Sequence, residues 1–266
     1  MELQDLRKWM FLLAYFRNGV SLVQNYRSGG LLASGPAMEE AVLWSGERIT
    51  HPPHQSGMVG TILEIWYDNV YRIGDFYTPQ ADDVILDVGA HIGLFSIYVK
   101  RQESRCRVVA LEPSQNFAYA ERNVRAFGLQ QVQIYRLAIG GRRGTVRIVT
   151  ETNRSIDGRS VPAEGVEADS VEVVTLDDLF EIAATERIAL LKMDVEGAEH
   201  DVFSQASNEA LCRIDHIALE YHDHYRPGTL ALLKSRLNAT HEISVIPDPG
   251  TGHGRLFASR RGFEVG

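Results

Sequence analysis

The chain has 266 residues, of which 44% are hydrophobic and 23% charged, a balance that excludes a disordered, collagen-like or coiled-coil chain. Its 27 basic and 35 acidic residues give a net charge of −8, which disfavours broad binding to nucleic acid. The two cysteines, Cys106 and Cys212, lie far apart and without metal-ligand spacing. A disulfide framework and a zinc ribbon are therefore excluded.

The N-terminal segment, residues 1–27, has the spacing of an amphipathic helix. Charged residues separate apolar residues that recur at helical intervals: Leu3, Leu6, Met10, Leu13 and Val20. No stretch of the chain approaches the ~20 apolar residues that a membrane span needs, and the apolar run lacks a signal-peptide cleavage site. We expect a helix packed on the domain rather than a membrane-surface or dimerisation helix, in a cytoplasmic protein.

Residues 28–57 are rich in glycine, serine and proline and are typical of loops and short elements. A helical pattern follows from residue 58. We expect Trp66, Tyr67 and Tyr71 to pack between this segment and the rest of the fold, although they could also cover a site. Residues 1–80 are therefore predicted to form an N-terminal helical or cap segment.

From residue 83 onward, short apolar runs alternate with helical patterns. The main predicted strands lie at 84–88, 108–112, 131–139, 188–194 and 214–221, with shorter ones at 145–149 and 171–175. A closing pair is expected at 242–246 and 255–259. This alternation predicts an α/β domain over residues 81–266, with a doubly wound, mostly parallel sheet.

The first motif is a glycine turn between a buried strand and a helix. It reads Asp87-Val88-Gly89-Ala90-His91-Ile92-Gly93. Ligands bind at the carboxyl ends of the strands in such sheets, and glycines there let the backbone approach a ligand closely. The GxxxG spacing differs from the GxGxxG of dinucleotide-binding proteins, which disfavours a nicotinamide-dependent oxidoreductase.

The second motif is Glu112, which ends the next strand 19 residues after Gly93. An acid at this place can accept hydrogen bonds from both hydroxyls of a ribose. Because Pro113 follows it, Glu112 could instead cap the next helix. Together with the glycine turn, Glu112 favours a ribose-bearing cofactor without a pyrophosphate, since no dense phosphate cradle is present.

The strongest local signal is the charged segment around the end of the 188–194 strand. It reads Lys192-Met193-Asp194-Val195-Glu196-Gly197-Ala198-Glu199-His200. If the strand stays extended, Lys192, Asp194 and Glu196 share one face. Burying three charges without partners is costly, so we interpret them as site residues. Glu199 lies in the following helix, within a turn of Glu196.

Two further groups of polar residues are candidates for the site. Glu220 and His222 come at the end of the 214–221 strand and are expected to converge with Asp194 at one edge of the sheet. Asn153 lies in the polar segment 151–170, which could be a substrate lid, although an ordinary surface loop explains it at least as well.

Five segments together carry a resemblance to a known family. In chain order they are DVGAHIG at 87–93, LEPS at 111–114, TLDDL at 175–179, KMDVEGAE at 192–199 and ALEYH at 218–222. This order resembles the FkbM family of S-adenosylmethionine-dependent methyltransferases over roughly residues 58–260. The resemblance implies a class I methyltransferase fold with a seven-stranded sheet and an antiparallel last strand. It also implies O-methylation of a sugar, polyketide or similar metabolite.

The resemblance also guides the assignment of roles. It places Asp87, Gly89 and Gly93 at the methionine end of the cofactor and Glu112 at the ribose, while His91 stands where many members carry Asn. The full set of expected cofactor contacts is Asp87, Gly89, Ala90, His91, Gly93, Glu112, Pro113, Ser114, Ala138 and Asp194. The expected catalytic residues are Asp194, His222, Glu196 and Glu220, and the expected substrate contacts are Lys192, Glu199 and Asn153.

Two mechanisms fit this set of residues. Asp194 or His222 could act directly as general base, or Asp194, Glu220 and His222 could hold a divalent cation. No dedicated metal spacing is present, so we expect a metal-free site.

The expected partner is a small-molecule hydroxyl acceptor, without nucleic acid or membrane; a homodimer is compatible with the sequence. A methyltransferase acting on a macromolecule remains an alternative. So does a non-catalytic cofactor-binding protein of the same fold, although the intact charged cluster disfavours it.

Overall fold

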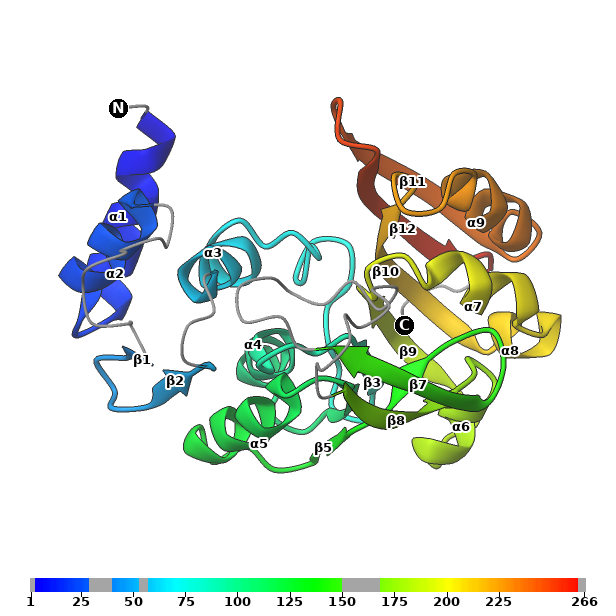
Figure 1. Ribbon diagram of the computed structural model, residues 1–266, viewed down its shortest axis with the longest axis horizontal. Coiled ribbons are helices and arrows are strands. Elements are labelled where there is room, and N and C mark those ends of the chain that lie inside the picture. The colour runs from blue at the N-terminus through cyan, green and yellow to red at the C-terminus, as the bar shows by residue number, and fades with distance from the viewer. Residues whose placement is uncertain (1–2, 29–39, 53–56, 150–167, 263–266) are drawn as a thin grey trace.

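The computed structural model describes residues 3–28, 40–52, 57–149 and 168–262, and a seven-stranded sheet forms its centre (Figure 1). The strands lie in the order β11 (His241–Asp248), β12 (His253–Arg260), β10 (Ile214–His222), β9 (Ile188–Met193), β3 (Val84–Val88), β4 (Arg107–Leu111) and β5 (Val132–Tyr135). Neighbouring strands are parallel except at β12, which is antiparallel to both β10 and β11. The predicted doubly wound sheet with an antiparallel last strand is confirmed.

Helices cover both faces of this sheet. Helices α4 (Leu94–Gln102) and α5 (Asn116–Ala126) contribute to one core, while α6 (Asp178–Ile182), α7 (Glu199–Gln205), α8 (Asn208–Cys212) and α9 (Thr229–Leu237) contribute to the other. Alternate residues of a strand enter opposite cores, as Ile85 and Leu86 do in β3. Burial on both faces explains why the central strands are continuous apolar runs rather than alternating ones.

The predicted strand over 131–139 is wrong as a single element. It divides into β5 and β6 (Ala138–Ile139), and β6 belongs to a separate three-stranded sheet with β8 (Ala168–Val174) and β7 (Gly144–Val149). Tyr135 pairs with Leu111, the last residue of β4. Beyond it β4 offers no further residue to pair with, and Ala138 pairs with Val173 of β8 instead.

The N-terminal segment forms two helices, α1 (Leu3–Tyr15) and α2 (Gly19–Arg27), so the prediction of one continuous helix is wrong. Between them Phe16 forms an isolated bridge with Leu43, beside the hairpin of β1 (Glu40–Val42) and β2 (Arg48–Thr50). A Cβ atom on Gly19 would lie 2.5 Å from the carbonyl oxygen of Leu12. Glycine therefore allows the close approach of α2 to α1.

These helices do pack on the domain, but by a different face from the one predicted. The side chains of Leu6, Met10, Leu13 and Val20 are between 39% and 63% exposed. Leu12, Phe16 and Leu22 are buried instead, in the core that also contains residues of α4 and α5. None of the helices in the described part of the chain is both long and apolar enough to cross a membrane.

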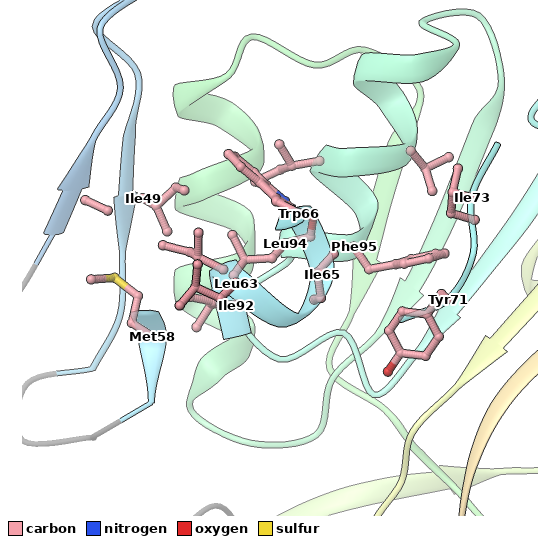
Figure 2. Close-up of a cluster of buried hydrophobic side chains, with 14 of the residues drawn as sticks. Ile49, Met58, Leu63, Ile65, Trp66, Tyr71, Ile73, Ile92, Leu94 and Phe95 are labelled. Carbon is pink, nitrogen blue, oxygen red and sulfur yellow. Dashed lines mark hydrogen bonds between the residues drawn. The ribbon is translucent and has the colours of Figure 1, made fainter. Parts of the chain in front are cut away.

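A second N-terminal element connects this segment to the sheet. Helix α3 (Met58–Ile62) continues into a π-helical turn, η1 (Leu63–Tyr67), whose Trp66 indole donates a hydrogen bond to the carbonyl oxygen of Leu94 at 3.1 Å. Figure 2 shows Trp66 and Tyr71 within the cluster of apolar side chains around Phe95. The predicted aromatic packing is confirmed, and the Tyr71 ring meets that of Phe95 edge-on at 5.2 Å.

The close contact at Gly19 leaves no room for a side chain. Gly19→Ala should lower the free energy of unfolding by about 1–3 kcal/mol, because the new methyl group meets main-chain atoms that cannot move aside. Gly60→Ala is the matched control, since a Cβ atom there meets nothing within 4 Å. Urea unfolding of both variants checks this. Equal stability of the two variants would contradict the close packing of α1 on α2.

Candidate active site

One cavity of about 600 Å³ lies at the carboxyl ends of β3, β4 and β9. Three segments of the predicted site line it, together with parts of β6, β7, β8 and the N-terminal segment. The predicted residues among the lining are Gly89, Ala90, His91, Glu112, Pro113, Ser114, Ala138, Lys192, Asp194 and Glu196. Asn153 lies outside the described residues. The size is that of a site for a small organic ligand.

The two glycines of the turn have different structural roles. Gly89 has a φ of +77°, and a Cβ atom on it would lie 1.8 Å from the carbonyl oxygen of Asp194. Glycine is therefore required for the chain after β3 to pass against the end of β9. Gly93, with a φ of +83°, precedes α4, and a Cβ atom there would lie 3.3 Å from Cα of Ala120 in α5. It serves helix packing rather than the cavity wall.

Asp87 and Lys192 form a buried ion pair beneath the turn. The ammonium nitrogen of Lys192 lies 3.1 Å from Oδ1 of Asp87 and donates a hydrogen bond to the carbonyl oxygen of Gly89 at 2.7 Å. Oδ2 of Asp87 accepts a hydrogen bond from Ser96 at 2.7 Å. Burial alone would lower the pKa of Lys192, but the charges of Asp87 and Asp194 raise it above its usual value. The pair supports the turn from below.

The prediction that Lys192, Asp194 and Glu196 share one strand face is wrong. Strand β9 ends at Met193, and the chain then turns through a φ of +52° at Glu196 and +102° at Gly197. Alternation of side chains holds only in an extended chain. Lys192 therefore points under the glycine turn, whereas Glu196 belongs to the turn beyond Asp194.

Glu112 joins the glycine turn to the turn after β4. One carboxylate oxygen accepts the main-chain N–H of His91 at 2.8 Å, and the other accepts the N–H of Ser114 at 3.0 Å and its hydroxyl at 2.5 Å. The Ser114 hydroxyl in turn accepts the N–H of Asn116 at the start of α5 at 3.1 Å. Burial raises the pKa of Glu112, although these donors oppose it. Glu112 therefore supports the helix start through Ser114 and also lines the cavity, while the ribose contact stays a prediction.

His91 has a backbone conformation that accounts for the residue type at this position. Its φ is +52°, in the left-handed region where Asn, Asp and His are enriched among non-glycine residues. A change between Asn and His is thus compatible with the turn. Burial, followed by the charge of Lys192, lowers the pKa of His91 to about 4. The imidazole on the cavity wall is therefore neutral at neutral pH.

A cluster of acidic residues and a histidine lies at the ends of β9 and β10; Asp194 and Glu196 line the cavity, and His222 lies beside it, outside the lining. Asp194, Glu196 and His222 each place one oxygen or nitrogen within 4.8 Å of the others. Nδ1 of His222 lies 2.9 Å from Oε1 of Glu199, and its Nε2 lies 3.5 Å from Oε2 of Glu196. Glu199 is fully buried and also accepts the N–H of Gly197 at 3.1 Å. It lies behind His222 and away from the cavity lining, so it orients His222 rather than contacting a substrate as predicted.

The charges around His222 and Glu220 shift both pKa values. Burial would lower the pKa of His222, but the hydrogen bond with Glu199 and the charges of Glu199, Glu196 and Asp194 raise it to about 9. Burial, with the charges of Asp194 and Glu64, raises the pKa of Glu220 to about 8. Both groups are therefore largely protonated at neutral pH.

Glu220 is close enough to Asp194 for that charge to act on it, but it does not line the cavity. His253, in the adjacent strand β12, has its Nε2 3.0 Å from Asp248 and 3.8 Å from Glu220. Glu220 thus forms a second group with Asp248 and His253, while Glu196 takes the place that the sequence assigned to Glu220 beside Asp194 and His222.

Sequence reasoning missed the N-terminal side of the cavity. Thr61, Glu64 and Tyr71 line it, and the Tyr71 hydroxyl lies 3.4 Å from Oδ2 of Asp194, to which it donates a hydrogen bond. Burial and the charge of Asp194 raise the pKa of Tyr71 well above its usual range, so the hydroxyl keeps its proton. The aromatic run at 66–71 was the available signal, but its residues were assigned mainly to packing.

The sheet order and the site together define a class I, Rossmann-like methyltransferase fold. A solved FkbM methyltransferase from Methylobacillus flagellatus superposes with a TM-score of 0.51 and 17% identity, covering 90% of this chain and 60% of that one. The Methyltransferase FkbM domain matches residues 87–264. The chain therefore belongs to the FkbM methyltransferase family.

Curated relatives agree with this assignment. The chain is 28% identical to Methyltransferase 1 of Beauveria bassiana over 197 residues, which cover 66% of this chain and 77% of that protein. It is 27% identical to methyltransferase sdnD of Sordaria araneosa over 213 residues, covering 65% and 79%. It is also 29% identical to the AMB antimetabolite synthetase AmbE of Pseudomonas aeruginosa over 244 residues, covering 75% of this chain but 11% of that protein.

The environment of His222 predicts how stability depends on pH. The pKa of His222 is about 9 in the folded chain against an ordinary 6.5. The stabilisation that protonated His222 gives the fold is therefore complete below pH ~6.5 and is lost as the pH rises through ~9. We therefore compare the free energy of unfolding of the wild type with that of His222→Gln. The advantage of the wild type should be larger at pH 6 than at pH 10 by roughly 2–3 kcal/mol. Thermal unfolding of both proteins in a chelating buffer checks this. A difference independent of pH would show that His222 is neutral in the fold.

Proposed function

We propose that this methyltransferase transfers the methyl group of S-adenosylmethionine to a hydroxyl oxygen of a small metabolite, such as a sugar or a polyketide. One observation carries the proposal. The same cavity has the glycine turn and Glu112 in its wall and also Asp194 and Glu196. A nucleoside cofactor at the first group and an acceptor at the second would therefore share one enclosed space, as a direct transfer requires.

The residues at the cofactor end fit a ribose-bearing group. Gly89, Ala90 and His91 provide a turn whose open side faces the cavity, and Pro113, Ser114 and Ala138 line the wall beside Glu112. A carboxylate has about four acceptor positions, and protein donors use three of those on Glu112. One ribose hydroxyl can therefore bind directly. A second can bind if the Ser114 hydroxyl rotates away.

The acceptor end can remove a proton from a hydroxyl group. S-adenosylmethionine supplies an electrophilic methyl group on a sulfonium, and the chain must hold an oxygen in line with it. Because the pKa of His222 is about 9, its imidazole carries a proton at neutral pH and cannot act as the base. Asp194 is then the direct proton acceptor. Glu196 is placed to accept a hydrogen bond from the acceptor molecule.

The size and charge of the site support a small acceptor. A cavity of about 600 Å³ is in the range of sites for small organic ligands, and the net charge of −8 opposes approach of a nucleic acid. Among the relatives, AmbE is described as an antimetabolite synthetase. This is consistent with work on a small metabolite, although the match covers 11% of that protein.

Calorimetry tests the cofactor. We expect the protein to bind S-adenosylmethionine and its demethylated product but not NAD. Glu112→Ala should weaken this binding at least about tenfold, because one charge-assisted hydrogen bond is worth ~1.5–3 kcal/mol. Glu121→Ala removes the same charge from an exposed position on α5 and should leave the affinity unchanged. Micromolar binding of NAD without binding of S-adenosylmethionine would overturn the proposal.

Asp194→Asn tests the acceptor end of the cavity independently of the cofactor end. The variant should lose transfer of radiolabelled methyl groups to a panel of hydroxylated acceptors, because an amide cannot take up the proton. Its affinity for S-adenosylmethionine should change by less than about threefold, since the substitution keeps shape and falls on the acceptor side. Undiminished transfer in Asp194→Asn would remove Asp194 from the mechanism.

A further inference from the structure

Three side chains of types that can bind a metal ion come together at the cavity, two in its lining and one beside it. Asp194 directly follows β9, Glu196 lies in the turn beyond it, and His222 ends β10. One oxygen or nitrogen of each lies within 4.8 Å of the others. Asp194 and Glu196 both line the cavity. The group therefore lies at the end of the cavity where the acceptor is proposed to bind, a placement that rests on the proposed function.

His222 is oriented by Glu199, which also accepts the N–H of Gly197 in the turn after β9. The imidazole is 4% exposed, and its Nδ1 lies 2.9 Å from Oε1 of Glu199, a side chain with no exposed surface. Nε2 of the same ring is directed toward Glu196 at 3.5 Å. Histidines that bind metal ions usually donate their second ring N–H to a carboxylate in this manner, which fixes the tautomer and the ring orientation.

Asp194 provides an independent observation. Its Oδ1 is buried and accepts no hydrogen bond from the described residues, and its Oδ2 accepts a long one of 3.4 Å from Tyr71. The ammonium group of Lys192, two residues earlier, is engaged by Asp87 and Gly89. A buried anionic oxygen without a partner is costly. This oxygen therefore points to a cation supplied from the cavity.

The backbone is arranged to bring Glu196 into the group. Its φ of +52° is uncommon for a residue other than glycine and has a conformational cost. This conformation takes Glu196 out of the strand alternation and places its carboxylate beside Nε2 of His222. A straight continuation of β9 would not form the group.

We propose that Asp194, Glu196 and His222 bind one divalent cation, Mg²⁺ or Mn²⁺, which displaces the proton from Nε2 of His222 and holds two neighbouring oxygens of the methyl acceptor. The two carboxylates suit these cations, which keep several positions for water or substrate oxygens, and the imidazole nitrogen favours Mn²⁺ over Mg²⁺. The acceptor class is then a vicinal diol or an α-hydroxycarbonyl compound. This departs from the metal-free site expected from the sequence, and its third ligand is Glu196 rather than Glu220.

The cation would assist the same transfer by lowering the pKa of the bound hydroxyl. The hydroxyl proton passes to the Asp194 oxygen that is not on the cation. An electron pair of the acceptor oxygen forms the new O–CH₃ bond, while the S–CH₃ bond breaks and its pair stays on sulfur. The products are a methyl ether, the neutral thioether of the cofactor and a proton, which Asp194 releases to water.

Binding of Mn²⁺ to the full chain tests the site without knowledge of the acceptor. Electron paramagnetic resonance of free Mn²⁺ should show one saturable site per chain after removal of endogenous metal. Glu196→Gln, Asp194→Asn and His222→Gln should each weaken it at least about tenfold, as loss of a ligand or its support does. Glu220→Gln is the matched control. It removes a nearby carboxylate of the group with Asp248 and His253 and should change the affinity less than about threefold.

A parallel titration with S-adenosylmethionine separates this proposal from the proposed function. Cofactor binding without saturable Mn²⁺ binding would overturn the cation site and leave the proposed function standing. Mn²⁺ binding that is weakened as much by Glu220→Gln as by Glu196→Gln would overturn the ligand set. Mn²⁺ binding with the expected variant pattern, but without cofactor binding, would support the site and remove the proposed cofactor.

Discussion

The ammonium group of Lys192 is the contact on which the arrangement of the site depends. It is 2.7 Å from the carbonyl oxygen of Gly89 and 3.1 Å from Oδ1 of Asp87, and the side chain is 4% exposed. Removing one partner of such a pair costs about 3–5 kcal/mol, because the other charge remains buried without compensation. The pair connects β3 to β9 at a directly paired register position, Asp87 opposite Lys192. It thereby fixes where the glycine turn meets the residues that follow β9.

Two main-chain segments, the turn after β3 and the end of β9, lie in close contact, and this contact sets the position of the residues that face the cavity. The N–H of Asp194 donates to the carbonyl oxygen of Val88 at 3.0 Å, and Gly89 lies directly against the Asp194 carbonyl. The carboxylate of Asp194 is therefore placed by the backbone of both strands. The turn at Glu196 and Gly197 then leads into α7, whose first residue, Glu199, reaches back to His222. The positions of Glu196 and Glu199 therefore depend on how the contact between Gly89 and Asp194 places the end of β9.

The sequence predicted those features that follow from local patterns and failed where the tertiary context decides. The glycine turn, Glu112 and Asp194 were found because parallel strands bring their carboxyl ends to one edge of the sheet. The different direction of Lys192 was missed because face alternation assumes an extended chain, and no residue type announced the positive φ of Glu196. Likewise, the spacing in α1 shows which residues share a face. It does not show that the face containing Leu12 is the buried one.

The carboxylates around the cavity differ in what compensates their charge, and this difference separates structural from functional groups. Lys192 compensates Asp87, and two N–H groups and a hydroxyl stabilise Glu112. Both acids hold the turns in place with partners built into the fold. Asp194 has a buried oxygen without such a partner among the described residues, and with Glu196 it faces the cavity. Since folding alone would favour a neutral residue there, the charge at that end is explained by what enters the cavity.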